Sequence, residues 1–168
     1  TYVGTVASGG ASAGRTRLRI VGGAGGWGRT IPKKPYANDA GVKASTVLVD
    51  AASAVGETID ATTLPTTRLG PHWARAEAPA ARVLELIMPA AWYVGDDGVT
   101  RIGARTSAAY AGKAAREPVD KAAGVVVLAP ETLTGLAPGV VVDGVTAVDV
   151  LHELTKGKLR TTIFGRLG

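Results

Sequence analysis

The chain has 168 residues, no cysteine and a formal net charge of +5. Its length suits about one domain with a sizeable hydrophobic core, and the absence of cysteine excludes disulfides, thiolate zinc sites and cysteine nucleophiles. No apolar run is long enough to cross a bilayer, so we expect no membrane span. The positive charge keeps a nucleic-acid-binding module among the hypotheses, but the basic residues are scattered, which more often indicates a solvated face.

Small and β-branched side chains dominate the apolar part of the composition. Hydrophobic residues make up 46% of the chain, while only 5% of the residues are aromatic. A core built from such side chains suits β-strands, on which branched residues pack well. It also favours assembly with other subunits.

Two N-terminal segments alternate in the way that a half-buried strand does. They span residues 2–7 and 15–21, and the second places Leu18 and Ile20 on one face and three arginines on the other. The arginines are Arg15, Arg17 and Arg19. Residues 8–14 are rich in glycine, serine and alanine, so they predict a flexible connector in a long-looped hairpin.

The connector contains a match to a catalytic motif. Residues 10–14 fit G-x-S-x-G, in which Ser12 would be a hydrolase nucleophile on a sharp strand-to-helix turn. A strand pattern follows Gly14 where that motif requires a helix. The match therefore favours a hairpin loop, and a hydrolase that uses Ser12 or His72 is kept as a rival hypothesis.

Residues 23–28 match G-x-G-x-x-G, the pattern of a dinucleotide-binding turn. Pro32 and Pro35 follow closely, and they prevent the helix whose N-terminus would hold a pyrophosphate. The pattern favours a glycine-rich bend instead, with Trp27 anchoring it on the core or on a neighbouring subunit.

The stretch 42–102 predicts helix, loop, helix and hairpin. Ser45 is placed to cap a first helix whose apolar positions recur at 48, 51, 52 and 55 and which ends at Gly56. Residues 57–73 predict a polar loop or short edge strand. Pro79 suits the first turn of a second helix that is ended by Pro89.

A hairpin is predicted directly after the second helix. Residues 91–94 and 99–102 are β-prone and flank an Asp-Gly turn. Asp96 and Asp97 are interpreted as turn residues in preference to metal ligands, because no further carboxylates stand at the spacing of a metal-binding loop.

The remainder of the chain predicts mostly short strands. Residues 106–124 are alanine-rich and suit a short helix or a surface loop, and strands are expected at residues 125–128, 140–142, 145–154 and 159–167. The predicted fold class is α+β: a small β-barrel built from residues 1–38 and 103–168, with an α/β layer of residues 39–102 inserted into it, as a single compact unit.

The sequence contains no recognised arrangement of catalytic or metal-binding residues beyond the matches weighed above. His72 and His152 are the only histidines, and they do not form a metal-binding spacing with each other or with carboxylates. His152 lies in an alternating strand pattern, and a lone loop histidine such as His72 beside Trp73 more often packs than catalyses. We expect no enzyme activity, no catalytic residues, no metal and no cofactor.

A family resemblance goes further than these patterns. Residues 47–59 (VLVDAASAVGETI), 72–87 (HWARAEAPAARVLELI) and 92–101 (WYVGDDGVTR) follow one another as a helix, a loop, a second helix and a D-x-G hairpin. Residues 133–144, 148–153 and 159–162 add a "pGd.v.v.G"-like strand, a "V.sV.H"-like strand and a threonine-rich final strand. From about Arg15 onward this order resembles phage tail hub proteins, a family that includes the late control protein of contractile phages and the base of the type VI secretion spike.

The resemblance implies a structural virion protein. It would form a ring at the tail tip, the baseplate hub, that joins the tail tube to spike or fibre proteins, and it would be assembled in the host cytoplasm. A homotrimer is favoured, with a hexamer as the alternative, and the central channel would pass DNA or tape-measure protein without specific recognition. Family members are often about twice this length and carry two barrels. The chain would therefore be a reduced hub or, as the alternative, another tail or neck adaptor.

The same resemblance gives a role to the aromatic and basic residues. Trp27, Trp73, Trp92 and Tyr93 would be core or interface anchors, because buried aromatic residues dominate such contacts. Arg15, Arg17 and Arg19 would face a partner or the channel.

Overall fold

The structure is a computed structural model, and it describes residues 3–13, 15–89, 92–116, 120, 122–130, 135–155 and 158–167. Its contacts divide the chain into two compact units in place of the single one expected. The helical unit comprises Thr1–Ser8 and Arg19–Arg105, and the sheet unit comprises Gly9–Leu18 and Thr106–Gly168. Residues 19–38, which the sequence pattern assigned to the barrel-like region, therefore group with the helices. Each unit has its own cluster of buried apolar side chains.

The first helix of the helical unit, α1 (Ala44–Ala54), lies where its apolar periodicity placed it. Its inward face buries Val47, Leu48, Ala51 and Ala52 completely or almost so. The predicted cap is wrong, because the helix begins two residues earlier than expected and its N-cap is Lys43, which forms no side-chain capping bond. The chain leaves the helix through a glycine with φ of 76° at position 56, as expected for a helix stop.

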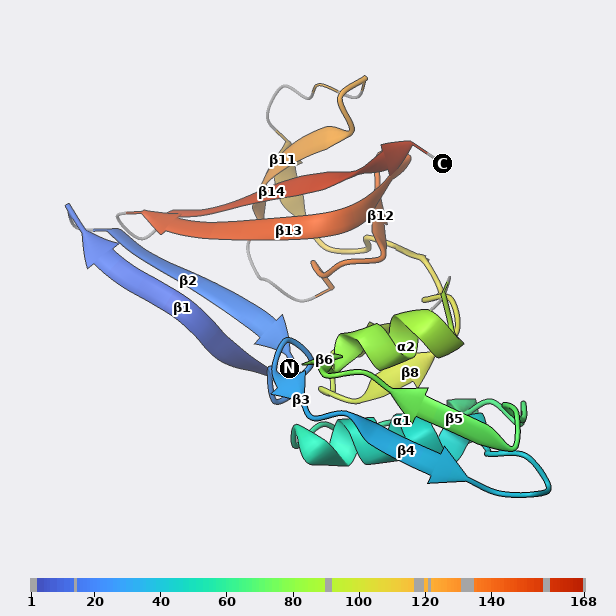
Figure 1. The fold of residues 1–168 in the computed structure, drawn as a ribbon. Coiled ribbons are helices and arrows are strands. Elements are labelled where there is room, and N and C mark those ends of the chain that lie inside the picture. Colours follow the sequence, from blue (N-terminus) through green and yellow to red (C-terminus); the bar gives the residue numbers. More distant parts are fainter. Residues whose placement is uncertain are drawn as a thin grey trace. The chain divides into compact units, whose positions relative to one another are not determined.

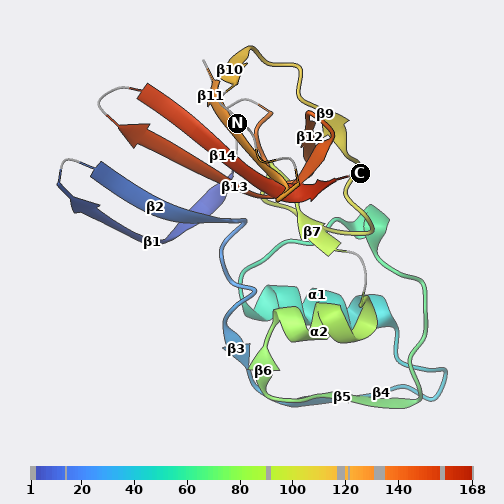
Figure 2. The ribbon, with the colours of Figure 1, turned by 90° about the horizontal axis from the view of Figure 1, so that it is seen from above.

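The second helix, α2 (Ala81–Ile87), contacts α1 and buries Val83 and Leu84 (Figure 2). It starts later than predicted. Pro79 lies in the short strand β6 (Ala78–Pro79), which pairs with β3 (Thr30–Ile31), so it precedes the helix and does not occupy its first turn.

Short antiparallel pairs surround the two helices. β4 (Lys34–Ala37) pairs with β5 (His72–Arg75), and β7 (Trp92–Val94) pairs with β8 (Thr100–Ile102), which confirms the predicted hairpin. The loop between α1 and β5 includes a single turn of 3-10 helix, η1 (Ala61–Thr63). Together these elements enclose one core under the helices.

The glycine-rich bend of residues 23–28 wraps around a carboxylate of the same unit. Glu57 is buried, and its side chain accepts hydrogen bonds from the backbone N–H groups of Gly26 at 2.5 Å and Ala24 at 3.2 Å. Gly23 and Gly25 have φ near 70°, a region that favours glycine. The bend prediction is confirmed, and the strand β3 follows it in place of a dinucleotide-binding helix.

The sheet unit contains one curled, six-stranded sheet with the character of a half-barrel (Figure 1). Its order is β10 (Ala114–Arg116), β11 (Val125–Pro130), β14 (Lys158–Leu167), β13 (Val145–Thr155), β12 (Val140–Val142) and β9 (Ala108–Ala109). All neighbouring strands are antiparallel except β9 and β12. The fold is thus α+β with a β-barrel-like part. In the described residues of the 106–124 segment the strands β9 and β10 replace the predicted helix or loop.

The core of the sheet unit lies on one face of this sheet. Val126 and Leu128 of β11, Ile163 of β14 and Val145 of β13 are fully buried there. A bulge between Ala147 and Asp149 shifts the register of β13 against β14. Asp143 and Gly144 form the predicted turn before β13, with φ of 52° and 83°.

The N-terminal hairpin, which we call the arm, consists of β1 (Gly4–Ser12) and β2 (Arg15–Gly22) and forms a separate two-stranded sheet. The prediction of a half-buried first strand is wrong, because every residue of β1 is exposed. The expected long loop is also wrong, because β1 continues through the small residues up to Ser12. Backbone pairing extends a strand wherever a partner strand is present, and it does not require large side chains.

The buried Glu57 carboxylate generates a first prediction. Glu57→Gln replaces an acceptor oxygen with a donor amide, so one of the two backbone N–H groups loses its partner, and we expect the helical unit to lose about 1–3 kcal/mol of unfolding free energy. Urea unfolding followed by tryptophan fluorescence measures this unit selectively, because all three tryptophans lie within it. The control is Glu85→Gln on the exposed side of α2, and equal stability of the two variants would contradict the proposed importance of the bend.

Candidate assembly interface

The predicted aromatic anchors all lie in the helical unit. Trp27 is only 7% exposed, its indole N–H donates to the hydroxyl of Thr100 at 2.9 Å, and its ring centroid lies 5.9 Å from that of Trp92. Trp92 is half-buried against the same core. These two residues serve as packing anchors between the glycine-rich bend and the β7–β8 hairpin.

The other two predicted anchors sit at the margin of that core. Trp73 packs against Tyr36 with ring centroids 5.8 Å apart. Tyr93 is half-buried, and the guanidinium of Arg105 lies 5.6 Å from its ring centroid. Both rings therefore have packing partners within the helical unit itself.

A charged cluster that the sequence patterns did not single out joins three elements of the helical unit. The carboxylate of Asp50 on α1 accepts hydrogen bonds from Lys34 at 2.5 Å, the Tyr36 hydroxyl at 2.6 Å and Arg75 at 2.7 Å. Arg75 is only 5% exposed and also donates to the carbonyl of Pro32. Both carboxylate oxygens accept hydrogen bonds from the same unit, which suits a structural ion cluster.

The pKa values of the cluster follow from these contacts. Burial pushes the pKa of Asp50 upward, but the hydrogen bonds from Lys34 and Tyr36 and the charge of Arg75 outweigh burial and leave the pKa below its ordinary value. Burial, together with the bond to Asp50, raises the pKa of Tyr36. The Asp50 carboxyl is therefore ionised at neutral pH, and the Tyr36 hydroxyl is protonated.

The acidic hairpin turn is held by its own strands. Asp97 accepts from the N–H of Val99 and from Arg101, and Asp96 pairs with Arg105 at 2.6 Å. The hydrogen bond from Arg101 holds the pKa of Asp97 well below its usual range. The part of the chain that the structure describes holds no group of three histidine or acidic side chains that would bind a metal. These contacts agree with the turn interpretation of both aspartates.

The candidate catalytic residues Ser12 and His72 belong to different units of the chain. Ser12 is exposed at the end of β1, before a turn and a second strand, and His72 is exposed at the start of β5. Neither side chain has a hydrogen-bonding partner among the described residues. Nδ1 of His152 lies 2.9 Å from the Thr161 hydroxyl, and burial lowers its pKa in spite of a bond to the backbone of Leu136.

The arm leaves apolar and basic side chains in water. Leu18 and Ile20 of β2 are 53% and 50% exposed, and Val6 of β1 is exposed to a similar extent. Arg19 is exposed on the other face of β2, while the side chains of Arg15 and Arg17 lie outside the described residues. An isolated two-stranded hairpin is only marginally stable in water, so a structure of this kind is normally supported by a further contact.

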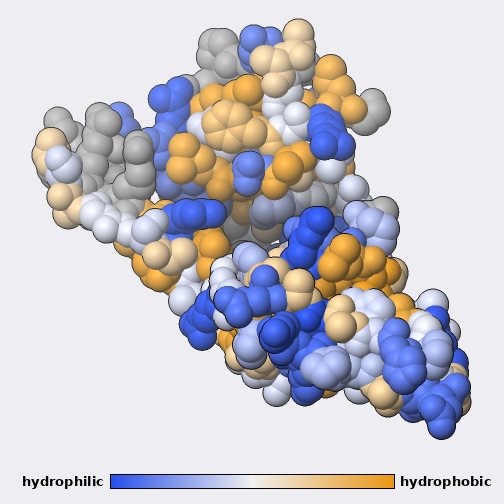
Figure 3. Space-filling model, in the orientation of Figure 1, coloured by the Kyte–Doolittle hydropathy of each residue, from blue (hydrophilic) through white to orange (hydrophobic). Residues whose placement is uncertain are grey.

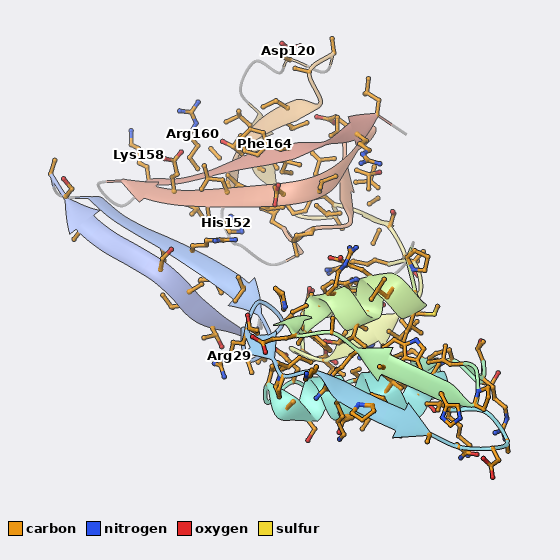
Figure 4. The ribbon with its side chains drawn as sticks, viewed as in Figure 1. Arg29, Asp120, His152, Lys158, Arg160 and Phe164 are labelled. Carbon is orange, nitrogen blue, oxygen red and sulfur yellow. The ribbon has the colours of Figure 1, made fainter. Side chains whose placement is uncertain are left out.

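The outer face of the sheet unit is the second exposed apolar surface. Phe164 of β14 and Leu151 of β13 are 43% and 37% exposed, and Figure 3 shows apolar side chains gathered over this part of the sheet. Lys158, Arg160 and Phe164 project from one side of the β13–β14 ribbon, and His152 projects from the other (Figure 4). An aromatic residue surrounded by aliphatic side chains with charges at the margin matches the anatomy of a protein–protein interface.

The sheet also has an open edge. β13 pairs with β14 along its whole length, but on its other side it pairs with β12 only at Val145 and Thr146. No described residue pairs with the backbone of residues 148–155 on that side. Unpaired strand edges of this length are templates for another strand, and proteins normally cover them.

Comparisons of this chain with protein-family models, with curated proteins and with solved structures found no match. Neither described α-helix has the length and apolar character that a membrane crossing requires. The candidate contact surfaces of the protein are the exposed arm, the outer sheet face and the open edge of β13.

The Asp50 cluster generates a second prediction. A carboxylate with a lowered folded pKa stabilises the fold above its unfolded pKa of about 3.8, and this stabilisation is lost as the pH falls through the folded value. Asp50→Asn should therefore cost about 1–3 kcal/mol at pH 7, and it should flatten the decline of stability between about pH 5 and pH 3.

Urea unfolding at a series of pH values measures both effects. Asp39→Asn, at an exposed position, is the matched control and should leave the profile unchanged. Some slope remains in the variant because the pKa values of Asp60 and Asp97 are also lowered. An Asp50→Asn profile that is parallel to the wild type at all pH values would contradict the assignment.

Proposed function

We propose that this chain is a structural protein of a phage tail, a reduced member of the hub family, which forms a ring at the tail tip and connects the tail tube to spike or fibre proteins. The order of helix, loop, helix, hairpin and closing strands supports the family assignment. In this role the protein binds its partners and assembles, and it performs no catalytic step. It is assembled in the host cytoplasm and is located in the virion.

The observation that carries the proposal is the amount of strand surface left in water. The arm exposes apolar side chains on a marginal two-stranded hairpin, and β13 keeps an open edge beside a half-barrel. A subunit of a ring needs surfaces of this kind, because each copy uses one patch to meet the next copy and a different patch to meet the previous one.

The half-barrel character of the sheet unit fits the same proposal. We infer that the barrel is completed by strands from the N-terminal part of the chain, so that both chain ends contribute to its wall. Closure removes the open edges of a sheet, which is the general reason why β-barrels close. A ring of completed barrels leaves a central channel for DNA or tape-measure protein, and the basic residues of β2 would face that channel or a partner.

The oligomeric state gives the third prediction. Native mass spectrometry of the purified chain should give a species of three times the 17.0 kDa chain mass, or six times in the hexameric alternative, because association of copies in a ring covers exposed strand surfaces. The measurement is repeated at rising protein concentration and at high salt, to separate specific association from electrostatic clustering.

Localisation in particles completes the test. Gold-labelled antibody against the chain should mark the tail tip of intact particles in electron micrographs, with an antibody against the tail tube as the positional control. Label at the neck would support the adaptor alternative and remove the hub assignment. A strictly monomeric chain that never enters a particle would refute the whole proposal.

A further inference from the structure

Two strand edges of this chain lack a partner in the described residues, and they have similar length. β2 has 8 residues and pairs only with β1 in its two-stranded sheet. The open edge of β13 runs over residues 148–155, beyond its short pairing with β12. Each edge presents a row of backbone donors and acceptors that another strand is able to satisfy.

The two faces of β13 differ in character beside the open edge. Asp149, Leu151 and Glu153 lie on the outer face, where Asp149 is opposite Phe164 and Glu153 is opposite Arg160 of β14. Val150 lies on the inner face and packs against the core of the sheet unit. His152, also on the inner face, contacts Thr161. The apolar core of the unit therefore reaches the sheet boundary at Val150 without a further strand to cover it.

β2 carries the complementary pattern. Its alternate positions 15, 17 and 19 are arginines in the sequence, and the side chain of Arg19 is exposed. The intervening positions include Leu18 and Ile20, which are also exposed. The spacing of four residues between Asp149 and Glu153 equals the spacing between the first and third arginine. A strand with Arg19 on one face and Leu18 and Ile20 on the other thus matches an edge that carries two carboxylates of β13 on its outer face and Val150 on its inner face.

We propose that β2 of one copy of this chain adds to the open edge of β13 in a second copy. Backbone hydrogen bonds join the two strands, Arg19 of β2 meets the carboxylates of Asp149 and Glu153, and Leu18 and Ile20 extend the core beside Val150. Strand addition of this kind takes its affinity from the main chain and its specificity from the alternating side chains. The arm then adds two strands to the sheet of its neighbour.

The proposed ring supplies a second copy as the partner, because every chain in it carries both complementary edges. A contact between two different patches repeats head to tail, and it closes into a ring when the rotation between copies allows it. The inference rests on the proposed ring function and deepens it, since it names the surfaces through which the copies meet. It also assigns the arginines of β2 to a partner contact and not to the channel.

Mixing of single-cysteine variants tests the proposal directly. The natural chain has no cysteine, so each variant carries one thiol and a disulfide always joins two copies. Arg19→Cys is mixed separately with Asp149→Cys, Leu151→Cys and Glu153→Cys under mild oxidation, with one variant isotopically labelled. Because a disulfide needs Cα atoms about 4.4–6.8 Å apart, we expect labelled–unlabelled heterodimers to form preferentially at one of the three positions.

The matched control is Arg19→Cys mixed with Ser53→Cys, at an exposed position of α1. Heterodimer yields at the three β13 positions that do not exceed the Ser53 control would overturn the proposal. Mass analysis separates heterodimers from homodimers. Arg19→Cys homodimers without heterodimers would show that copies associate through the arm alone, and this result would also overturn the proposal.

Charge reversal gives a second, independent readout. Arg19→Glu places a like charge opposite the acidic face of β13 and should weaken self-association by roughly 3- to 30-fold in sedimentation analysis. Glu153→Arg in the same chain should restore part of the loss. The control is Lys33→Glu at an exposed position outside β2, and an equal effect of the two reversals would overturn the proposal.

The outcomes also separate this inference from the proposed function. A ring in native mass spectrometry without cross-linking to β13 overturns the arm contact and leaves the tail-tip ring standing. Efficient cross-linking in a protein that never enters particles supports the arm contact and refutes the tail-tip role.

Discussion

The helical unit depends on the way in which the Glu57 carboxylate is bound. A buried carboxylate is costly unless donors surround it, and here the donors are backbone N–H groups of Ala24 and Gly26 in the glycine-rich bend. The bend comes so close to the end of α1 that a side chain at Gly26 would collide with the carbonyl of Val55. Glycine is therefore required there for close approach, and the bend fixes the base of the arm, where Gly23 N–H donates to the carbonyl of Val3.

Thr100 joins the same structure from the other side. Its hydroxyl accepts from Trp27, its N–H donates to the carbonyl of Thr58, and its own carbonyl accepts from the N–H of Asp60. The β7–β8 hairpin is thus fastened both to the bend and to the segment that carries Glu57. A pattern that looks like a phosphate-binding turn in the sequence holds the protein's own Glu57 carboxylate, which gives its glycines a structural role.

Local patterns in the sequence predicted those elements whose burial is decided by their own periodicity. The 3.6-residue repeat of α1, the Asp-Gly turn before β8 and the alternation of β13 and β14 all gave elements close to the observed ones. Exposure of the arm was missed, because alternation shows that a strand has two different faces and does not show that anything covers either of them. The Asp50 cluster was missed for a related reason: its members come from β4, α1 and β5, and only the tertiary fold brings them together.

The open edge of β13, like the Asp50 cluster, could not be predicted from local sequence patterns, because it depends on which strands lie side by side in the fold. The sequence of β13 predicts a strand, but the edge exists because β12 is only 3 residues long and ends before it reaches Asp149. Apolar surface left in water at this edge costs free energy in proportion to its area. Because the core consists mainly of small and branched side chains, several residues must be covered together to remove that cost. Leu18 and Ile20 supply aliphatic surface of that kind on a strand that has no core of its own. The chain thus carries a sheet edge and a strand that lack partners in the described residues, and the proposed association of copies covers both in one contact.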